Sequence, residues 1–355
     1  MTRQPILEIF GVAAVTALSE GVVAYINHFG AWVEGGPCYG LPREPGLMLI
    51  VDGKVEKRVI TKIESATNFL DGILYSKTDE KGLYYYDYET SVKIHEEDYF
   101  IYNILGGRPV LDQTRKYKWL QPANRTPNEP YTIIGPDSRT AKYDYRPAVM
   151  YDNFYLAYEN EQFFHVSFDD RVVKWTFNIV DSGRNQRYWQ KHLMGISAEN
   201  FIYFPSPRAV ECVSTKNGQR LWRYETDQEI SYFSCSDRII CLGRLRDFVA
   251  IDPTTGRAIN MPQPSVESIF GGVLIMGGKF IDVGDFYLFH FVKFPAAVLV
   301  CAPRTCEQLA QISFKEGEGS IAPDGRGIQY LNGYLYINFI NGRLLVYDIR
   351  DLLGN

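Results

Sequence analysis

The amino-acid sequence predicts an all-β fold, a β-propeller of four-stranded blades, with eight blades preferred and seven as the alternative. Three observations predict it. The composition favours strands, a short apolar strand that ends in a polar residue recurs along the chain, and a hairpin turn follows most copies of that strand. The copies recur about every 42 residues, which is the period expected of a four-stranded propeller blade.

The composition favours strands and gives the chain a mild charge. Hydrophobic residues make up 46% of the chain and aromatic residues 14%, with 25 tyrosines and 21 phenylalanines, and aromatic residues are enriched in strands. The formal net charge is −5, and the lysines and arginines form no run. General nucleic-acid binding is therefore disfavoured, because it needs a row of cations against the phosphates. No apolar stretch reaches the roughly 18 residues that a membrane span requires.

The recurring strand gives the number of blades. Its eight copies end at Asp52, Asp87, Asp112, Ser167, Ser214, Asp252, Ala302 and Asp348. Seven blades are the alternative because the unit at 98–121 is short. An aspartate or serine at this place can accept hydrogen bonds from backbone N–H groups of the turn that follows. We therefore expect a structural role for it rather than a catalytic one.

The turns and the tryptophans predict how neighbouring blades meet. Gly218 and Gly256 lie where the hairpin reverses, and such a turn needs a residue that tolerates positive φ. Three tryptophans follow copies of the recurring strand by seven or eight residues: Trp119, Trp175 and Trp222. We expect each of these side chains to lie on an outer strand and to pack against the neighbouring blade.

The two ends of the chain are expected to complete one blade together. The last unit provides two strands and then ends without an outer strand, and residues 5–10 (PILEIF) have a strand-like pattern that fills this place. Such closure removes exposed sheet edges. We expect residues 1–355 to form a single propeller domain, with an inserted loop at 121–147, which is rich in proline, asparagine and arginine.

Two copies of the repeat resemble a known family. The pattern Ala-x-Asp-x-x-x-Gly-Lys-x-x-Trp is the hallmark of PQQ-like propeller repeats, named after the quinoprotein alcohol dehydrogenases. One copy matches it at Ala250, Asp252, Gly256 and Arg257, with Asn260 in place of the tryptophan. Another matches it at Ser214, Gly218 and Trp222, with substitutions elsewhere. The resemblance implies a propeller architecture.

A non-quinoprotein member of this family is expected. The quinoprotein enzymes are longer, and they commonly carry adjacent cysteines and acidic calcium ligands. This chain has neither Cys-Cys nor Cys-x-x-Cys-His. We therefore expect no cofactor.

The candidate partner-binding residues lie in two segments between repeats. The connection at 181–192 (DSGRNQRYWQKH) concentrates Arg184, Arg187, Tyr188 and Trp189, and these residue types are enriched at interface hot spots. The alternative is that Tyr188 and Trp189 begin an inner strand and pack in the core. The insertion contributes Asn124 and Arg125.

The sequence predicts a non-enzymatic scaffold that binds another protein through its loop-bearing face, as an adaptor, an assembly factor or a toxin-neutralising partner. The alternative is a propeller that binds a carbohydrate or other small ligand in its channel, as a glycosidase or lyase with paired carboxylates from different blades. No nucleophile elbow, P-loop, His-Glu-x-x-His or EF-hand pattern occurs, so we expect no catalytic and no metal-binding residue. His165 and His290 lie among apolar residues and are expected to be packed.

The cysteines and the first residues bear on the compartment. Cys235 with Cys241, and Cys301 with Cys306, flank short turns, so hairpin disulfides stay open as an alternative to free thiols. Residues 1–21 weakly imitate a secretory signal, but Glu8 interrupts the apolar run and no small-residue cleavage site follows. We expect a cytoplasmic protein, with a periplasmic or secreted one as the alternative.

Overall fold

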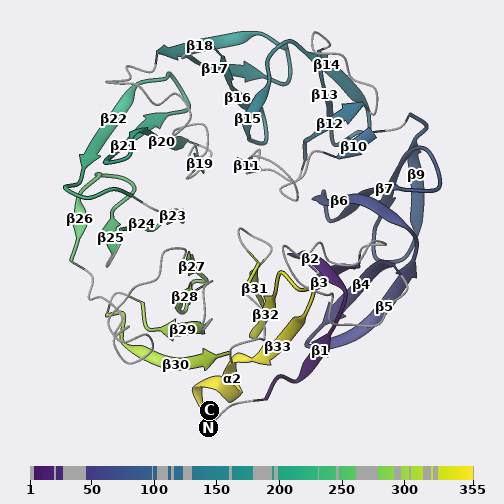
Figure 1. Ribbon diagram of the computed structural model, residues 1–355. Helices are drawn as coiled ribbons and strands as arrows, with labels where there is room; N and C mark the ends of the chain where they lie inside the picture. The colour runs from purple at the N-terminus through teal and green to yellow at the C-terminus, as the bar shows by residue number, and fades with distance from the viewer. Residues whose placement is uncertain are drawn as a thin grey trace. The chain divides into compact units, whose positions relative to one another are not determined.

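The computed structural model describes most of the chain. The described residues are 4–19, 21–26, 45–97, 99–101, 111–112, 116–122, 130–159, 162–178, 194–195, 199–230, 232–244, 248–260, 279–291, 297–303, 305–314, 321–322 and 327–354. They form eight separate sheets (Figure 1), each of which is one blade. The Cα positions divide the chain into two compact units, one of residues 1–98 and 262–355 and the other of residues 99–261.

The first unit contains blades 1, 2, 7 and 8, and neighbouring strands in each blade are hydrogen-bonded. Blade 1 has β2 (Val12–Ala17), β3 (Val22–Ile26), β4 (Gly46–Val51) and β5 (Lys54–Ile60). Blade 2 has β6 (Ile63–Phe69), β7 (Gly72–Lys77), β8 (Leu83–Tyr86) and β9 (Ser91–His95). Blade 7 has β27 (Lys279–Asp282), β28 (Tyr287–Phe291), β29 (Ala297–Cys301) and β30 (Gln308–Ser313). Blade 8 has β31 (Ile328–Leu331), β32 (Tyr334–Asn338), β33 (Leu344–Asp348) and β1 (Leu7–Ile9).

The second unit contains blades 3 to 6. Blade 3 has β10 (Tyr99–Ile101), β12 (Lys118–Pro122), β13 (Tyr131–Ile134) and β14 (Thr140–Tyr143). Blade 4 has β15 (Pro147–Met150), β16 (Phe154–Glu159), β17 (Gln162–Ser167) and β18 (Val173–Asn178), with β11 (Leu111–Asp112) added in parallel beside β15. Blade 5 has β19 (Met194–Gly195), β20 (Asn200–Ser206), β21 (Ala209–Ser214) and β22 (Arg220–Glu225). Blade 6 has β23 (Tyr232–Cys235), β24 (Ile240–Gly243), β25 (Phe248–Ile251) and β26 (Ala258–Ile259).

The ends of the chain complete blade 8, as the sequence predicts. In Figure 1 the purple strand β1 lies beside the yellow strand β33, and the two pair antiparallel with Leu7 opposite Val346. The N–H of Ile6 extends the pairing by donating to the carbonyl oxygen of Val346 at 2.9 Å. Arg343 Nε donates to Glu8 Oε1 at 2.6 Å. The ring of eight blades is thus closed, and the edge of β33 is covered.

A single short helix follows the last strand in the described residues. It is α2 (Ile349–Leu353), and the side chain of Asp348 accepts a hydrogen bond from the N–H of Arg350 at its start. A carboxylate at this place satisfies a backbone donor that the first turn leaves unpaired. The described part of the chain contains no helix with the length and apolar character needed to cross a membrane.

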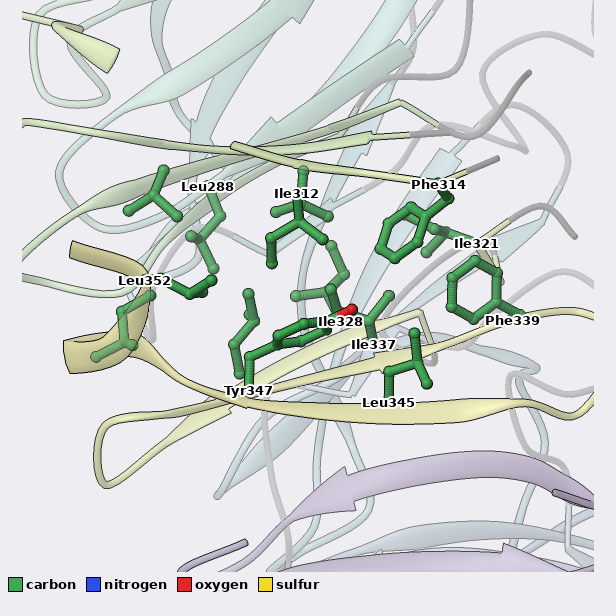
Figure 2. Close-up of a cluster of buried hydrophobic side chains, with 14 residues drawn as sticks. Leu288, Ile312, Phe314, Ile321, Ile328, Ile337, Phe339, Leu345, Tyr347 and Leu352 are labelled. Carbon is green, nitrogen blue, oxygen red and sulfur yellow. The ribbon is translucent and has the colours of Figure 1, made fainter. Parts of the chain in front are cut away.

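Apolar side chains fill the space between neighbouring blades. Figure 2 shows this for blades 7 and 8, where Leu288 and Ile312 face Ile337 and Leu345, and Leu352 of α2 closes one end of the cluster. Burial of each such side chain contributes about 1.5–3 kcal/mol. Successive residues of a strand point to opposite faces of its sheet, so a blade can bury apolar residues on both faces, as blade 8 does against blades 7 and 1.

The turn after the third strand repeats between blades. In blade 5 the N–H of Gly218 donates to the carbonyl oxygen of Ser214 at 3.0 Å, and in blade 6 the N–H of Gly256 donates to that of Asp252 at 2.9 Å. Cys306 stands at the corresponding position of the turn in blade 7. The backbone φ angle is 69° at Gly218, 68° at Gly256 and 51° at Cys306. Asp252 Oδ1 also accepts two backbone N–H groups of its turn, at 2.7 and 3.0 Å. The predicted structural role of this aspartate is confirmed.

The outer-strand tryptophans dock on the next blade's turn. The indole N–H of Trp222, on β22, donates to the carbonyl oxygen of Pro253 in blade 6 at 2.9 Å. Its ring lies so close to Gly256 that a Cβ there would be 2.5 Å from Cδ2. Trp175, on β18, donates to the carbonyl oxygen of Thr215 in blade 5 at 2.8 Å. Packing of these two tryptophans between blades is confirmed.

Blade 3 departs from the sequence prediction. The recurring strand was assigned to the segment that ends at Asp112, but β11 pairs with blade 4. The third strand of blade 3 is β13, and Trp119 lies on β12, the second strand, where it is 3% exposed. Its expected place on an outer strand is therefore wrong.

The segment 121–147 is also more than an inserted loop. It contains β13, β14 and the first residue of β15. The four-residue strands YTII and TAKY are joined by a turn at Gly135, whose N–H donates to the carbonyl oxygen of Arg139 at 3.0 Å. Strands this short are hard to recognise between proline-rich flanks. That the chain is one domain stays a prediction.

Candidate functional site

The residues predicted to bind a partner lie outside the described residues. They are Asn124, Arg125, Arg184, Arg187, Tyr188 and Trp189. Their role therefore stays a prediction, as does the alternative of a carbohydrate or small-ligand site.

His165 and the cysteines of the two predicted hairpin turns have structural surroundings. His165 packs between Phe154 and Trp175, with ring centroids 4.1 and 5.3 Å away. No disulfide joins Cys235 to Cys241 or Cys301 to Cys306. Burial raises the pKa of Cys301 to about 12 and that of Cys306 to about 11, so both stay protonated and unreactive at neutral pH. Within the described part of the chain, no three His, Cys, Asp or Glu side chains are grouped to hold a metal ion.

The described residues do form a groove between blades 1 and 2. Its volume is about 610 Å³, within the range of roughly 300–1,000 Å³ that is typical of ligand sites. Blade 1 contributes the β2–β3 turn and strands β4 and β5, and blade 2 contributes strand β8 with the β6–β7 and β8–β9 turns. We call this site the blade 1–2 groove.

Strand pairing explains why these side chains face the groove. Leu49 of β4 lies opposite Lys57 of β5, and side chains of directly paired residues point to the same face. Residues on the other face of β4, Met48 and Ile50, pack in the core with blade 8. Leu49, Val51 and Lys57 are therefore left to face blade 2.

Four carboxylates line the groove: Glu56, Asp71, Asp87 and Glu89. All four residues are exposed. Among the described lining residues, Lys57 is the one basic side chain. Four carboxylates against one ammonium group give the groove a net negative charge.

The β8–β9 turn is held in one conformation. Asp87 Oδ1 accepts the N–H of Thr90 at 2.7 Å and the N–H of Glu89 at 3.1 Å. The backbone donor of Thr90 and then that of Glu89 hold the pKa of Asp87 below its usual range, so this carboxylate stays ionised. Tyr88 has φ of 77°, and its carbonyl oxygen accepts Lys57 Nζ at 2.6 Å. The lining lysine thus ties blade 1 to this turn.

Two tyrosines complete the lining. Tyr85 of β8 packs edge-on against Phe69, with ring centroids 6.1 Å apart, and Tyr88 projects from the turn. Burial raises the pKa of Tyr85, and the charges of Asp71 and Asp87 raise it further. The Tyr85 hydroxyl therefore stays protonated at neutral pH. Aromatic faces beside carboxylates suit a cationic group.

Sequence reasoning missed this groove. The sequence predicts turn formation for Asp87, which is confirmed, but the residues that line the groove with it come from segments as distant as Ser19 and Leu49. The run YYYDYE at 84–89 has the required residue types. Nothing local, however, shows that Lys57 lies beside it.

No protein-family model matches the chain, and neither does any curated protein. Solved structures do match. The computationally designed Ika8 protein is similar at a TM-score of 0.62 and 9% identity over 98% of this chain and 100% of that one. The C-terminal WD40 domain of Sif2 is similar at 0.57 and 9%, over 97% of each chain. BamB from Moraxella catarrhalis has a TM-score of 0.45 and 10% identity, over 80% of this chain and 96% of its own.

At sequence identities of 9–10%, similarity to a solved structure shows the fold alone. The similarity to Ika8 and to the Sif2 domain extends over nearly the whole chain. It agrees with the eight sheets and with the closure by β1. The chain is an eight-bladed β-propeller, a fold that commonly serves as a protein-binding scaffold.

Proposed function

We propose that this chain is a non-enzymatic scaffold that binds another protein, and that the blade 1–2 groove is one of its contact sites. The observation that carries the proposal is the groove itself: about 610 Å³ at the junction of two blades, lined by carboxylates and tyrosines. Tyrosine is enriched at interface hot spots because it couples a large contact area with a polar end.

The rigidity of the groove supports binding. Its walls are paired strands, and the turn with Asp87 and Tyr88 is fixed by backbone hydrogen bonds and by Lys57. A site that is already ordered does not spend binding free energy on ordering loops. The groove therefore suits recognition by complementary shape and charge.

A second contact is proposed at the connection between blades 4 and 5. Arg184, Arg187, Tyr188 and Trp189 are the candidates there, with Asn124 and Arg125 as further contacts. We also propose membership of the PQQ-like repeat superfamily, supported by the docking of Trp222 on the turn at Gly256. A cytoplasmic location completes the proposal.

The test is an affinity purification from the native host with quantitative mass spectrometry. The bait is the full chain, either unchanged or with Ser19→Trp, which fills the groove from the exposed β2–β3 turn without altering its charges. Gln228→Trp, at an exposed position in the connection between blades 5 and 6, is the matched control. We expect a partner that the unchanged chain and Gln228→Trp capture equally and that Ser19→Trp loses at least tenfold.

Equal capture by all three baits would remove the groove from the interface. A fourth bait, Arg184→Ala with Arg187→Ala, tests the second contact in the same experiment. Melting temperatures of the four proteins must agree within a few degrees for the comparison to count. If no protein is enriched by the unchanged chain, the scaffold proposal fails.

A further inference from the structure

We propose that the blade 1–2 groove receives a lysine or arginine side chain from an extended segment of the partner, and that an aliphatic neighbour in that segment packs on Leu49 and Val51. This inference rests on the proposed function and adds the chemistry of the occupant. Three features of the groove support the inference. They are its negative charge, its two tyrosine rings, and its volume together with the aliphatic side chains of its lining.

The charge selects a cation. Each exposed carboxylate of the lining attracts a positive group, and the attraction becomes stronger as water between them is displaced. Lys57 offsets one of the four negative charges, and its ammonium group is held by the carbonyl oxygen of Tyr88 at 2.6 Å, so a net negative charge remains in the lining. Asp71 and Asp87 line the same groove from different turns of blade 2.

The rings favour an organic cation. Tyr85 and Tyr88 belong to the same lining as the carboxylates, and a guanidinium or ammonium group over a tyrosine face is attracted by the negative face of the ring. The Tyr85 ring is fixed by Phe69 and by the close approach of Gly72, where a Cβ would lie 2.9 Å from Tyr85 Cε2. A guanidinium group can also donate to carboxylates in a fork, which makes arginine the stronger candidate.

The size and the apolar part favour a peptide segment over a metal ion. A bare ion would leave most of the 610 Å³ unfilled, and the described residues offer no group of three metal ligands. Leu49, which is 6% exposed, and the partly buried Val51 both line the groove, so part of its lining is aliphatic. A basic side chain with an aliphatic neighbour complements both.

The test uses a defined probe and the full chain. The probe is a fluorescein-labelled, capped pentapeptide of alternating arginine and valine, and its control carries citrulline in place of each arginine, which keeps the shape and removes the charge. Binding is measured by fluorescence anisotropy at low and at physiological ionic strength. The groove variant is Asp71→Asn with Asp87→Asn, because an asparagine oxygen can still accept the turn hydrogen bonds at 87. The matched variant is Asp79→Asn with Asp237→Asn, two exposed aspartates outside the groove lining.

We expect the unchanged chain and the matched variant to bind the arginine peptide within twofold of each other. The groove variant and the citrulline peptide should each weaken binding at least tenfold. Binding should also weaken as the ionic strength rises, since salt screens exposed charges. Equal binding of the citrulline peptide, equal binding by the groove variant, or no binding at millimolar peptide would overturn the inference, and so would calcium chloride competing at micromolar concentration.

Failure here is distinguishable from failure of the proposed function. The groove variant is carried as a further bait in the affinity purification. If Ser19→Trp loses the partner while Asp71→Asn with Asp87→Asn retains it fully, the scaffold proposal holds and the cationic occupant is wrong. If both variants retain the partner, the groove is not a contact site at all.

Discussion

The ring of Trp175 covers the place where a side chain would start at Gly218. The tryptophan belongs to the outer strand of blade 4 and the glycine to a turn of blade 5, and a Cβ on Gly218 would lie 2.7 Å from Trp175 Cε3. The indole N–H donates to the carbonyl oxygen of Thr215 in that turn at 2.8 Å. One side chain thus fixes two blades through a ring contact and a hydrogen bond.

A related contact occurs one blade earlier with different residues. Tyr143, on the outer strand of blade 3, lies under the guanidinium group of Arg171 in blade 4, 5.7 Å from the ring centroid. Arg171 has φ of 59° and follows Ser167 at the same distance as Gly218 follows Ser214. The ring of Tyr143 is smaller than the indole ring of Trp175, so it leaves room for the Arg171 side chain in the turn.

Replacement of Gly218 by alanine should therefore be more costly than the same change at an open glycine. Positive φ alone costs an alanine about 1–2 kcal/mol, and the clash with Trp175 raises the expected loss at Gly218 to about 3 kcal/mol. Gly284 is the matched control, because its φ is 90° and a Cβ would meet nothing within 4 Å. There we expect a loss of about 1 kcal/mol in the free energy of unfolding, measured with urea. Equal losses at the two glycines would show that the ring contact does not matter.

The buried carboxylate of Glu211 should make blade 5 sensitive to loss of its arginine partner. Glu211 is 2% exposed and accepts Tyr203 Oη at 2.5 Å and Arg223 Nη1 at 2.7 Å. Arg223→Met should lower the free energy of unfolding by about 1–3 kcal/mol, since a buried charge loses a partner. The loss is limited for two reasons. Arg220 Nη1 still lies 3.3 Å from Glu211 Oε1, and the Arg223 side chain is partly exposed to solvent, which weakens its ion pair.

A matched variant and a double variant complete this test. Arg208→Met removes an exposed arginine of the same blade and should change the free energy of unfolding by less than about 0.5 kcal/mol. Glu211→Leu in the Arg223→Met background should recover part of the loss, because no charge is then left buried. If Arg223→Met and Arg208→Met have equal effects, the network contributes nothing to stability.

His165 should make stability depend on pH. Burial lowers its pKa below the usual value, so the folded state holds the ring neutral at a pH where the unfolded chain has begun to protonate it. The contribution is fully present above about pH 6.5, the usual histidine value, and is lost as the pH falls through the folded pKa. His165→Phe keeps a ring between Phe154 and Trp175. It should reduce the difference in free energy of unfolding between about pH 7.5 and pH 5.5, and an unchanged difference would contradict this assignment.

Most of the fold could be predicted because the repeat is local. A strand, its turn and the next strand are encoded within about 20 residues, so Ser214, Gly218 and Trp222 reveal a blade by their spacing. Blade 3 was misassigned for the opposite reason. Its third strand ends at Ile134 and is followed by Gly135 rather than by an aspartate or serine, while the segment at Asp112 carries the pattern and pairs elsewhere.

The sequence by itself predicted the strand content, eight blades in preference to seven, and the closure by residues 5–10, because alternating apolar residues and turn residues act between neighbours in the chain. Only the tertiary structure decided which side chains share a space between blades. Lys57 and Tyr88 meet at 2.6 Å, yet 31 residues separate them. Their contact depends on how two sheets pack face to face, and that packing is set by the burial of many side chains at once. No spacing along the chain encodes it.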